Sequence, residues 1–355
     1  MKINFVVVGY GETGGDKVVR KYSQLFYQKG NDVIIYAPII SYNFHHNKFN
    51  LINILKQIKG TIININNYFI KKIHQNSNFY KIVWKINDST IRNADATIAT
   101  AWPTSYDVNK LSYSKGRKYY FIQDYETWDN VEYGKKSYLL PLEKIVISTW
   151  IKNKINKLGI EDNSMKLVFN GIQIDDFENK DKNFDKNEIN CLMLSHVLDK
   201  KGVNIGIKAF EKAKKVNPNL KLTTFGLEKS KFIPSDVRFV QNPTKEKLRE
   251  MYSNSDIFIY PSIEEGWGLT PIEAMAAKCA VVGTNTGCMI DIGKNMVNSL
   301  LCEPNNVDDI SNNIIKLSNN KELRKSISIE GYKTVKKLNT WEEEADIFLN
   351  ILKNI

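Results

Sequence analysis

Residues 257–283 read IFIYPSIEEGWGLTPIEAMAAKCAVVG, and this stretch decides the fold. It begins and ends with short apolar runs, at Ile257–Tyr260 and Ala280–Gly283, which have the length and composition of buried strands. Between them, Pro271 suits the first turn of a helix that continues over residues 272–277. Short apolar runs that alternate with helices are typical of parallel sheets. The stretch therefore predicts an α/β fold.

The same alternation extends in both directions along the chain. Apolar runs at residues 3–8 and 33–36 flank a helical pattern over residues 17–29, which stops at Gly30. Further runs of strand length follow at residues 96–99, 119–122, 144–148, 189–194, 221–225 and 237–240. A polar, charged break at residues 178–188 divides the pattern in two. A chain of 355 residues is also too long for one ordinary core, so we expect two domains with doubly wound parallel sheets.

The net charge of +11 is concentrated in the first half of the chain. Residues 1–160 hold 23 Lys and Arg against 11 Asp and Glu, a net charge of +12, whereas residues 161–355 hold 27 against 28. This excess predicts an anionic partner for the first half, such as a lipid surface, a phosphorylated acceptor or a nucleic acid. The alternative is a general compositional bias towards Lys, Asn and Ile.

The cysteines show neither a C-x-x-C pair nor a nearby histidine cluster, so we interpret them as reduced thiols in a cytoplasmic protein. They are Cys191, Cys279, Cys288 and Cys302. The N-terminal apolar run is too short for a signal peptide and is interpreted as a strand. No stretch of the sequence approaches the roughly 18–20 apolar residues that a membrane span needs.

The loop in the opening stretch carries the strongest chemical signal. Gly266 and Gly268 allow the main chain to approach a ligand closely. The following helix N-terminus offers unpaired N–H groups and the positive end of a dipole, which suit a diphosphate. Glu265 and Glu273 flank this anion site, and carboxylates accept hydrogen bonds from vicinal hydroxyls. The combination predicts that one carboxylate holds a sugar and the other a ribose. An acid near a helix start can also be a simple dipole complement, which would explain Glu273 alone.

A second glycine-rich turn, Gly9-Tyr10-Gly11-Glu12-Thr13-Gly14, fits the G-x-G-x-x-G pattern of NAD enzymes. That fingerprint requires a carboxylate at the end of the second strand, but this strand ends Ile35-Tyr36-Ala37-Pro38 and Asp32 precedes it. The added residues Gly15 and Asp16 also argue against the helix opening at the third glycine. We therefore expect a phosphate-binding turn, with a purely structural turn and an NAD site as alternatives.

Residues 262–290 resemble the signature of retaining glycosyltransferases of family 4, with the E-x7-E motif at Glu265 and Glu273. Weaker matches fall in the order that this family requires, at Gly14-Gly15, Val168-Phe169-Asn170-Gly171-Ile172, Lys201-Gly202 and Thr340-Trp341. The resemblance implies a GT-B fold, with two Rossmann-like domains facing a cleft. Residues 1–170 would bind the acceptor, residues 171–339 would bind the nucleotide-sugar donor, and a helix over residues 340–355 would pack back on the first domain.

The resemblance also implies roles for individual residues. Glu273 would bind the ribose, Glu265 would bind the donor sugar, and Lys201 would stabilise the leaving diphosphate. The remaining donor contacts would come from Gly14, Gly15, His196, Gly266, Trp267, Gly268, Leu269 and Thr270. No metal and no cofactor are expected, because the chain contains no D-x-D pair and a donor phosphate oxygen can take the acceptor proton.

Two positions depart from the family pattern. His196 stands where members usually carry an Arg on the diphosphate, and it cannot form a guanidinium fork. Gln123 replaces the His of a frequent His-Asp pair, which leaves Asp124 as the best catalytic candidate facing the sugar and Glu126 as the second. An Asp at a strand end is also a common turn former. Residues 101–106 and 123–126 are similar to a rhamnosyltransferase-like branch.

The sequence thus predicts a retaining, metal-independent transfer of a hexosyl or deoxyhexosyl group from a nucleotide-diphosphate sugar. The acceptor would be a glycan, a lipid-linked molecule or a protein, in the synthesis of surface polysaccharide or glycoconjugate. The expected location is the cytoplasm, with an anionic membrane surface as a partner of the basic half and no nucleic acid. A catalytically silent homologue that acts as a partner subunit is one alternative, and an NAD-dependent oxidoreductase is another. The sugar, the nucleobase, the linkage and the oligomeric state are left open.

Overall fold

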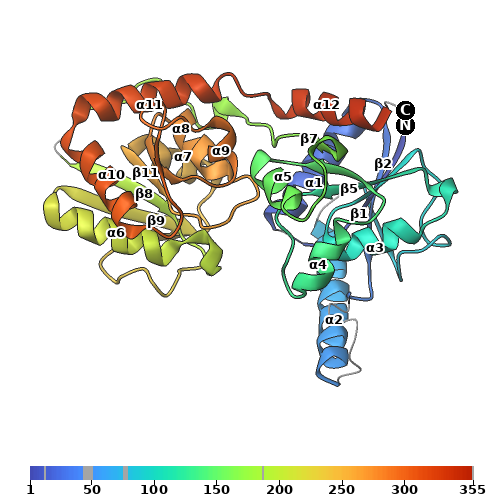
Figure 1. The fold of residues 1–355 in the computed structure, drawn as a ribbon. Coiled ribbons are helices and arrows are strands. Elements are labelled where there is room, and N and C mark those ends of the chain that lie inside the picture. The colour runs from blue at the N-terminus through green and yellow to red at the C-terminus, as the bar shows by residue number, and fades with distance from the viewer. Residues whose placement is uncertain (12, 43–50, 75–78, 186–187, 354–355) are drawn as a thin grey trace. The chain divides into compact units, whose positions relative to one another are not determined.

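The computed structural model describes residues 1–355 except residues 12, 43–50, 75–78, 186–187 and 354–355 (Figure 1). The chain divides into two compact units. Unit 1 consists of Met1–Ile147, Ile151–Asn170 and Trp341–Ile355, and unit 2 consists of Ser148–Trp150 and Gly171–Thr340. Each unit contains one sheet whose paired strands all run parallel. The predicted fold class, two α/β domains with parallel sheets, is confirmed.

Unit 1 has a seven-stranded sheet in the order β3-β2-β1-β4-β5-β6-β7. Its strands are β1 (Lys2–Val6), β2 (Asp32–Pro38), β3 (Tyr80–Val83), β4 (Ala96–Ala99), β5 (Arg117–Ile122), β6 (Glu143–Val146) and β7 (Met165–Leu167). Its helices are α1 (Gly14–Gln28), α2 (Leu51–His74), α3 (Trp102–Lys110), α4 (Val131–Ser137), α5 (Thr149–Asn156) and α12 (Trp341–Lys353), with 3-10 turns η1 (Tyr113–Lys115) and η2 (Asp162–Ser164). The first two residues of α5 group with unit 2.

Unit 2 has a six-stranded sheet in the order β10-β9-β8-β11-β12-β13. Its strands are β8 (Ile189–Leu194), β9 (Leu220–Gly226), β10 (Arg238–Gln241), β11 (Ile257–Tyr260), β12 (Ala280–Thr284) and β13 (Leu300–Cys302). Its helices are α6 (Val203–Val216), α7 (Lys245–Asn254), α8 (Leu269–Ala276), α9 (Cys288–Ile292), α10 (Val307–Asn319) and α11 (Lys321–Val335), with 3-10 turns η3 (Ile174–Asp176) and η4 (Asp199–Lys201).

Helix α12 packs into the core of unit 1 through Phe348 and through Trp341, whose ring centroid lies 5.5 Å from that of Tyr22. The ring centroid of Phe348 lies 5.0 Å from that of Phe121, 5.2 Å from that of Tyr22 and 5.3 Å from that of Phe26. Aromatic contacts at such distances stabilise a core beyond the area that they bury. They hold the C-terminal segment against β5 and α1, although about 170 residues of unit 2 precede it in the chain.

The strand order of each sheet reverses direction at one point, and ligands of open α/β sheets bind beside the carboxyl ends of the strands there. In unit 2 this switch point lies between β8 and β11, which pair in parallel with Ile257 beside Cys191. The loop after β8 leads to η4, and the loop after β11 leads to α8. In unit 1 the switch point lies between β1 and β4, where the glycine-rich turn follows β1.

All four cysteines are buried, and none of them forms a disulfide. Across the described ranges, no set of three or more His, Cys, Asp or Glu side chains has a geometry that could hold a metal ion. None of the helices in the described part of the chain combines the length and the hydropathy required to cross a bilayer.

Candidate active site

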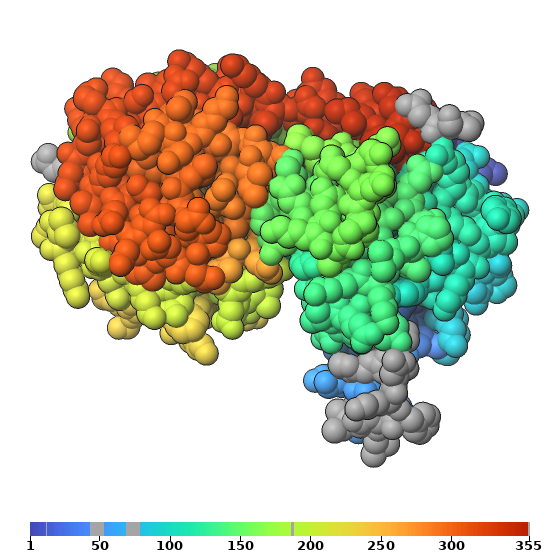
Figure 2. Space-filling model, in the orientation of Figure 1, coloured from blue at the N-terminus to red at the C-terminus, as the bar shows by residue number. Residues whose placement is uncertain are grey.

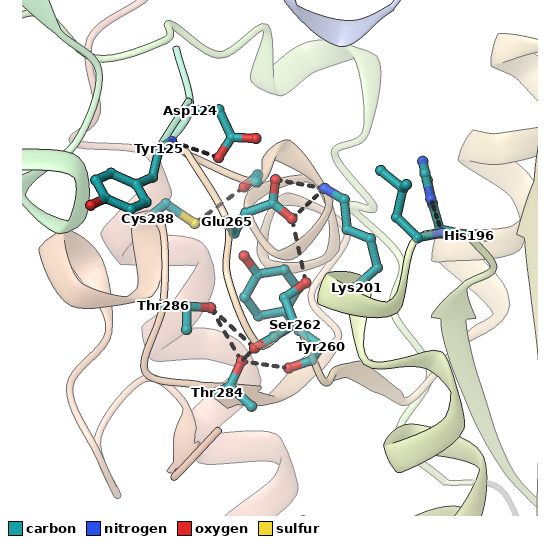
Figure 3. Close-up of polar contacts among 12 residues, drawn as sticks. Asp124, Tyr125, His196, Lys201, Tyr260, Ser262, Glu265, Thr284, Thr286 and Cys288 are labelled. Carbon is teal, nitrogen blue, oxygen red and sulfur yellow. Dashed lines mark hydrogen bonds and ion pairs between the residues drawn. The ribbon is translucent and has the colours of Figure 1, made fainter. Parts of the chain in front are cut away.

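A partly buried ion pair occupies the switch point of unit 2. Lys201, the last residue of η4, donates from Nζ to both carboxylate oxygens of Glu265, at 2.7 and 2.5 Å (Figure 3). The two side chains are only 19% and 14% exposed. Ser262 Oγ, 3.3 Å away, donates a further hydrogen bond to Glu265. The two residues that the sequence assigns to the diphosphate and to the sugar are therefore in direct contact.

The loop that carries Glu265 is held by the hydroxyl groups of Thr284, the last residue of β12, and of Thr286, which follows it. Thr284 Oγ1 donates to the carbonyl oxygen of Ser262 at 2.5 Å, and Thr286 Oγ1 donates to the same oxygen at 3.4 Å (Figure 3). The main-chain N–H of Cys288 donates to the carbonyl of Trp267 at 2.6 Å. These contacts hold the loop within unit 2, and such preorganisation is what electrostatic catalysis requires.

Gly268 is the N-cap of α8, and this position requires a glycine for two reasons. Its φ of +83° lies in the left-handed region, and a Cβ at this position would lie 2.6 Å from the hydroxyl oxygen of Tyr260. Gly268, Leu269 and Thr270 are partly exposed, so the N–H groups of the first turn of α8 can be reached from solvent. Trp267, in contrast, is 3% exposed and packs into unit 2 below the loop.

Glu273 lies one turn into α8 and is mostly withdrawn from water. Burial raises the pKa of its carboxyl group to about 7, against the opposing effect of the hydrogen bond from Tyr252. Tyr252 donates that bond at 2.8 Å from α7. A carboxyl group in this range changes between a form with two acceptor oxygens and a form that also donates, at ordinary working pH.

His196 lies between β8 and η4 and is half-buried. Its Nδ1 accepts a hydrogen bond from the main-chain N–H of Leu198 at 3.0 Å, so the ring proton of the neutral form lies on Nε2. Burial, and then the positive charge of Lys201, lower the pKa of His196. At neutral pH the side chain can therefore offer one hydrogen bond from Nε2 but carries no charge.

The glycine-rich turn of unit 1 opens its helix earlier than expected. The helical pattern predicts a start at residue 17, whereas α1 begins at Gly14 because Thr13 and Asp16 form a reciprocal capping box. The expectation that Gly15 and Asp16 separate the turn from the helix is therefore wrong, and Gly14 and Gly15 form its first turn. Glu12 lies outside the described residues.

The missing ribose carboxylate remains an obstacle to the NAD alternative. Asp32, the first residue of β2, lies at the end of the strand opposite to the turn and forms an ion pair with Arg92 at 2.6 Å. Nothing in the sequence of β2 supplies another acid, since the strand reads DVIIYAP. The turn thus follows β1 without the acid on β2 that would hold a dinucleotide.

Gln123 lies beside this turn in unit 1. A Cβ added to Gly15 would lie 3.5 Å from the Gln123 amide nitrogen. The side-chain oxygen of Gln123 is buried, and no described residue donates a hydrogen bond to it. Buried polar atoms are nearly always paired in a working protein, so this atom is a candidate contact for a ligand. The periodicity of the sequence gives no signal for this proximity.

Asp124 and Glu126 follow β5 and face different surroundings. The Asp124 carboxylate accepts a hydrogen bond at 2.8 Å from the N–H of Tyr125, the next residue, as a turn-forming Asp does (Figure 3). Glu126 is 3% exposed and points into unit 1, where it accepts hydrogen bonds from the Trp102 N–H and from the Tyr120 hydroxyl. The expectation that Glu126 faces the sugar is therefore wrong. Its carboxylate instead caps α3, whose N-cap Ala101 has no side-chain acceptor.

Burial raises the pKa of Glu126 to about 8, against the effect of these hydrogen bonds. A carboxyl group whose pKa is higher in the folded chain than in the unfolded chain binds its proton more tightly when folded. The stability that it contributes is thus complete at low pH and is lost as the pH rises through 8. We expect the free energy of unfolding to fall by about 2 kcal/mol more in the wild type than in Glu126→Gln between pH 6 and pH 9.

Urea unfolding followed by tryptophan fluorescence at several pH values measures this difference, since Trp102 lies in contact with the carboxylate. The amide keeps an acceptor for the Trp102 N–H but cannot ionise. Parallel pH profiles of the two proteins would show that Glu126 does not titrate in this range.

The sequence of unit 2 is similar to a known protein family. Residues 175–334 match the family described as Glycosyl transferases group 1. The chain is 28% identical over 207 residues to an uncharacterised glycosyltransferase of Methanocaldococcus jannaschii, which covers 56% of each chain. It is 30% identical over 226 residues to CapM of Staphylococcus aureus, a capsular polysaccharide biosynthesis glycosyltransferase, with 59% of each chain covered. The chain thus spans less than two thirds of the length of these relatives.

Among solved structures, HepE of Anabaena in complex with UDP superimposes with a TM-score of 0.73 at 13% identity, over the full length of both chains. A likeness at this identity establishes the fold of both units. Residues 175–334, most of unit 2, are thus similar to the group 1 glycosyl transferases, and the two units share the fold of HepE.

Proposed function

We propose that the chain is a retaining, metal-independent glycosyltransferase that uses a nucleotide-diphosphate sugar as donor. The observation that carries the proposal is the Lys201–Glu265 pair at the switch point of unit 2, directly before the N-terminus of α8. A cation, the N–H groups at the start of α8 and a carboxylate for hydroxyls thus lie on the loops that follow β8 and β11. These are the groups that a sugar diphosphate would engage.

In this proposal the donor replaces the Lys201–Glu265 ion pair with one new contact for each residue. Lys201 moves to the diphosphate, and Glu265 accepts hydrogen bonds from hydroxyls of the donor sugar. The N–H groups of Gly268, Leu269 and Thr270 add positive potential at the same phosphate. Glu273 accepts from the ribose hydroxyls, and His196 contributes one neutral hydrogen bond from Nε2.

The bond between the anomeric carbon and the diphosphate oxygen breaks in an oxocarbenium-like transition state, and its electron pair stays on that oxygen. The acceptor hydroxyl forms the new bond on the same face, and its proton passes to a donor phosphate oxygen. Lys201 and the α8 N–H groups stabilise the developing negative charge, a role that a metal ion fills in other enzymes. Asp124 remains a candidate for orienting the acceptor from unit 1.

The relatives support a surface-polymer role without fixing the substrate. CapM is named for capsular polysaccharide biosynthesis, and HepE was solved with UDP, with UDP-glucose, and with UDP and glucose. We infer a hexosyl or deoxyhexosyl donor and a glycan, lipid-linked or protein acceptor. The net charge of +12 over residues 1–160 supports a location at an anionic membrane surface.

A silent homologue that binds donors without transferring them is the second candidate. It is favoured by the neutral His196 and by Asp124, whose carboxylate is engaged in a local turn. A thermal-shift screen with UDP-, GDP- and dTDP-sugars would identify the donor, and release of the free nucleotide diphosphate would measure transfer or hydrolysis. Binding together with release supports the enzyme. Binding without release from any donor and acceptor supports the partner subunit, and no binding at all contradicts both.

A further inference from the structure

Helix α2 of unit 1 has its polar side facing the protein. Side chains along this side hydrogen-bond the segment after β2 and the turn after β1. The bonds run from Gln57 to the Ser41 carbonyl at 2.8 Å, from the Ser41 N–H to Thr61 at 3.1 Å, from Asn64 to the Pro38 carbonyl at 3.3 Å and from Asn67 to the Tyr10 carbonyl at 3.4 Å. A helix that covers a hydrophobic core normally turns its apolar side inward, so α2 is oriented the opposite way.

The outward side of α2 is apolar. Its large exposed side chains are Leu55, Ile58, Ile62 and Ile63, with 48 to 57% of each side chain in contact with water. At about 100° per residue these four positions span roughly 140° of the helix circumference. Figure 1 shows α2 extending away from the sheet of unit 1, and its atoms project from the surface in light blue in Figure 2. Several large apolar side chains gathered on one side of a projecting helix mark an interaction surface, although the exposed residues Lys59 and Asn66 lie among them.

The charge on α2 has one sign. The sequence of the helix contains no Asp or Glu, and its exposed side carries Lys56 and Lys59 among the apolar residues. At about 100° per residue, Lys59 lies between Leu55 and Ile63, and Lys56 lies at the edge of the arc. A helix side that combines apolar residues with lysines is suited to the plane of a membrane interface. The apolar side chains enter the acyl boundary while the lysine stems extend to anionic headgroups.

We infer that α2 is the element by which unit 1 binds an anionic lipid surface, with its axis parallel to the membrane plane. This inference deepens the proposed membrane location and rests on it, but it is independent of the transfer chemistry in unit 2. Pairing with a second copy fits the charges less well, because a twofold contact would bring Lys56 and Lys59 against their own copies with no acid on either helix. The described helices include none that could cross the bilayer.

The polar side of α2 also connects this surface to the candidate acceptor region. Asn67 donates to the carbonyl of Tyr10, inside the turn after β1, and a Cβ on Gly9 would lie 2.7 Å from the Asn64 side-chain oxygen. The lipid-binding helix and the glycine-rich turn are therefore packed as one body. If α2 rests on a membrane, the turn lies next to it, where an acceptor carried on a lipid would arrive.

The test uses the full chain and sedimentation with vesicles, either of phosphatidylcholine alone or mixed with phosphatidylglycerol. The double variant Ile58→Gln/Ile62→Gln keeps good helix formers but removes two apolar groups from the outward side of α2. We expect its partition onto mixed vesicles to fall about tenfold or more. The matched control Val131→Gln/Leu139→Gln changes residues of the same unit that are 55 and 65% exposed, and it should bind as the wild type does.

The charge variant Lys56→Gln/Lys59→Gln should lose binding to mixed vesicles and lose most of its dependence on added salt. Wild-type binding by the isoleucine variant, or an equal loss in the control, would overturn the assignment to α2. A dimer in analytical ultracentrifugation that the isoleucine variant dissociates would overturn it in favour of a second copy. Nucleotide-sugar binding, measured on the same variants, should be unchanged, and its absence in the wild type would contradict the transferase without touching α2.

Discussion

Replacing Lys201 by methionine is expected to lower kcat/KM for sugar transfer by roughly 100- to 1000-fold. The ammonium group is the one charged donor that we assign to the leaving diphosphate, and loss of one preorganised donor at developing charge has an effect of this size. Methionine keeps the length and apolar stem of the side chain, so packing around η4 is largely retained. Steady-state kinetics with the donor found in the screen measure the loss.

A second variant separates this electrostatic role from damage to the loop. Lys201→Met leaves the Glu265 carboxylate, 14% exposed, without its ion-pair partner, which can itself destabilise the site. In Lys201→Met/Glu265→Gln the unpaired charge is absent, so thermal stability should recover while turnover stays low. Lys208→Met, an exposed lysine on α6, is the matched control. Recovery of turnover in the double variant would show that Lys201 only neutralises Glu265.

Replacing Glu273 by alanine is expected to weaken binding of the nucleotide sugar about 30- to 100-fold. Hydrogen bonds between a carboxylate and hydroxyls contribute about 1.5–3 kcal/mol, and the truncation also leaves Tyr252 without its acceptor. Isothermal titration with the donor and with its free nucleotide diphosphate measures the change. Because the assigned contact is with the ribose, both ligands should lose affinity to the same extent. Glu211→Ala, an exposed acid on α6, serves as the control.

The pH dependence of donor binding provides an independent check on Glu273. Its pKa of about 7 means that the group is mostly protonated at pH 6 and mostly ionised at pH 8. Only the ionised form accepts from both hydroxyls, so affinity should increase between these values, by up to about tenfold per pH unit below the pKa. Glu273→Gln should bind weakly with no such increase. A decrease with rising pH in the wild type would contradict the assignment.

Most of the sheet could be predicted from the sequence, because buried parallel strands are short apolar runs. The predicted strands at residues 96–99, 189–194 and 257–260 coincide with β4, β8 and β11. The short edge strands β3, β7 and β13, of four, three and three residues, were missed because runs of that length carry little periodicity. Helix α2 was missed for another reason. Its apolar residues face solvent, so its pattern does not correspond to a core-facing helix.

From residue spacing alone, the candidate site was predictable only where its residues share one stretch of sequence, and Lys201 was assigned through the family resemblance. Glu265, Gly268 and Glu273 lie within one loop and one helix, so their spacing reveals them. The hydroxyls of Thr284 and Thr286 reach the same loop from the end of another strand, and Tyr252 reaches Glu273 from α7. Such partners depend on strand order. The inward direction of Glu126 likewise depends on which residues lie behind it, since Asp124 is two positions away and differs in burial.

The Lys201–Glu265 contact has a consequence for selectivity. Glu265 is bonded to the ammonium group that we assign to the donor, so it acts as a tethered competitor for Lys201 at high local concentration. Inorganic phosphate could take Lys201 only by leaving Glu265 unpaired. A sugar diphosphate supplies an anion for Lys201 and hydroxyls for Glu265 together, so it alone replaces both halves of the contact. The ion pair would thus lower the affinity of the site for small anions such as phosphate. Its effect on a sugar diphosphate would be smaller, because that ligand provides partners for both Lys201 and Glu265.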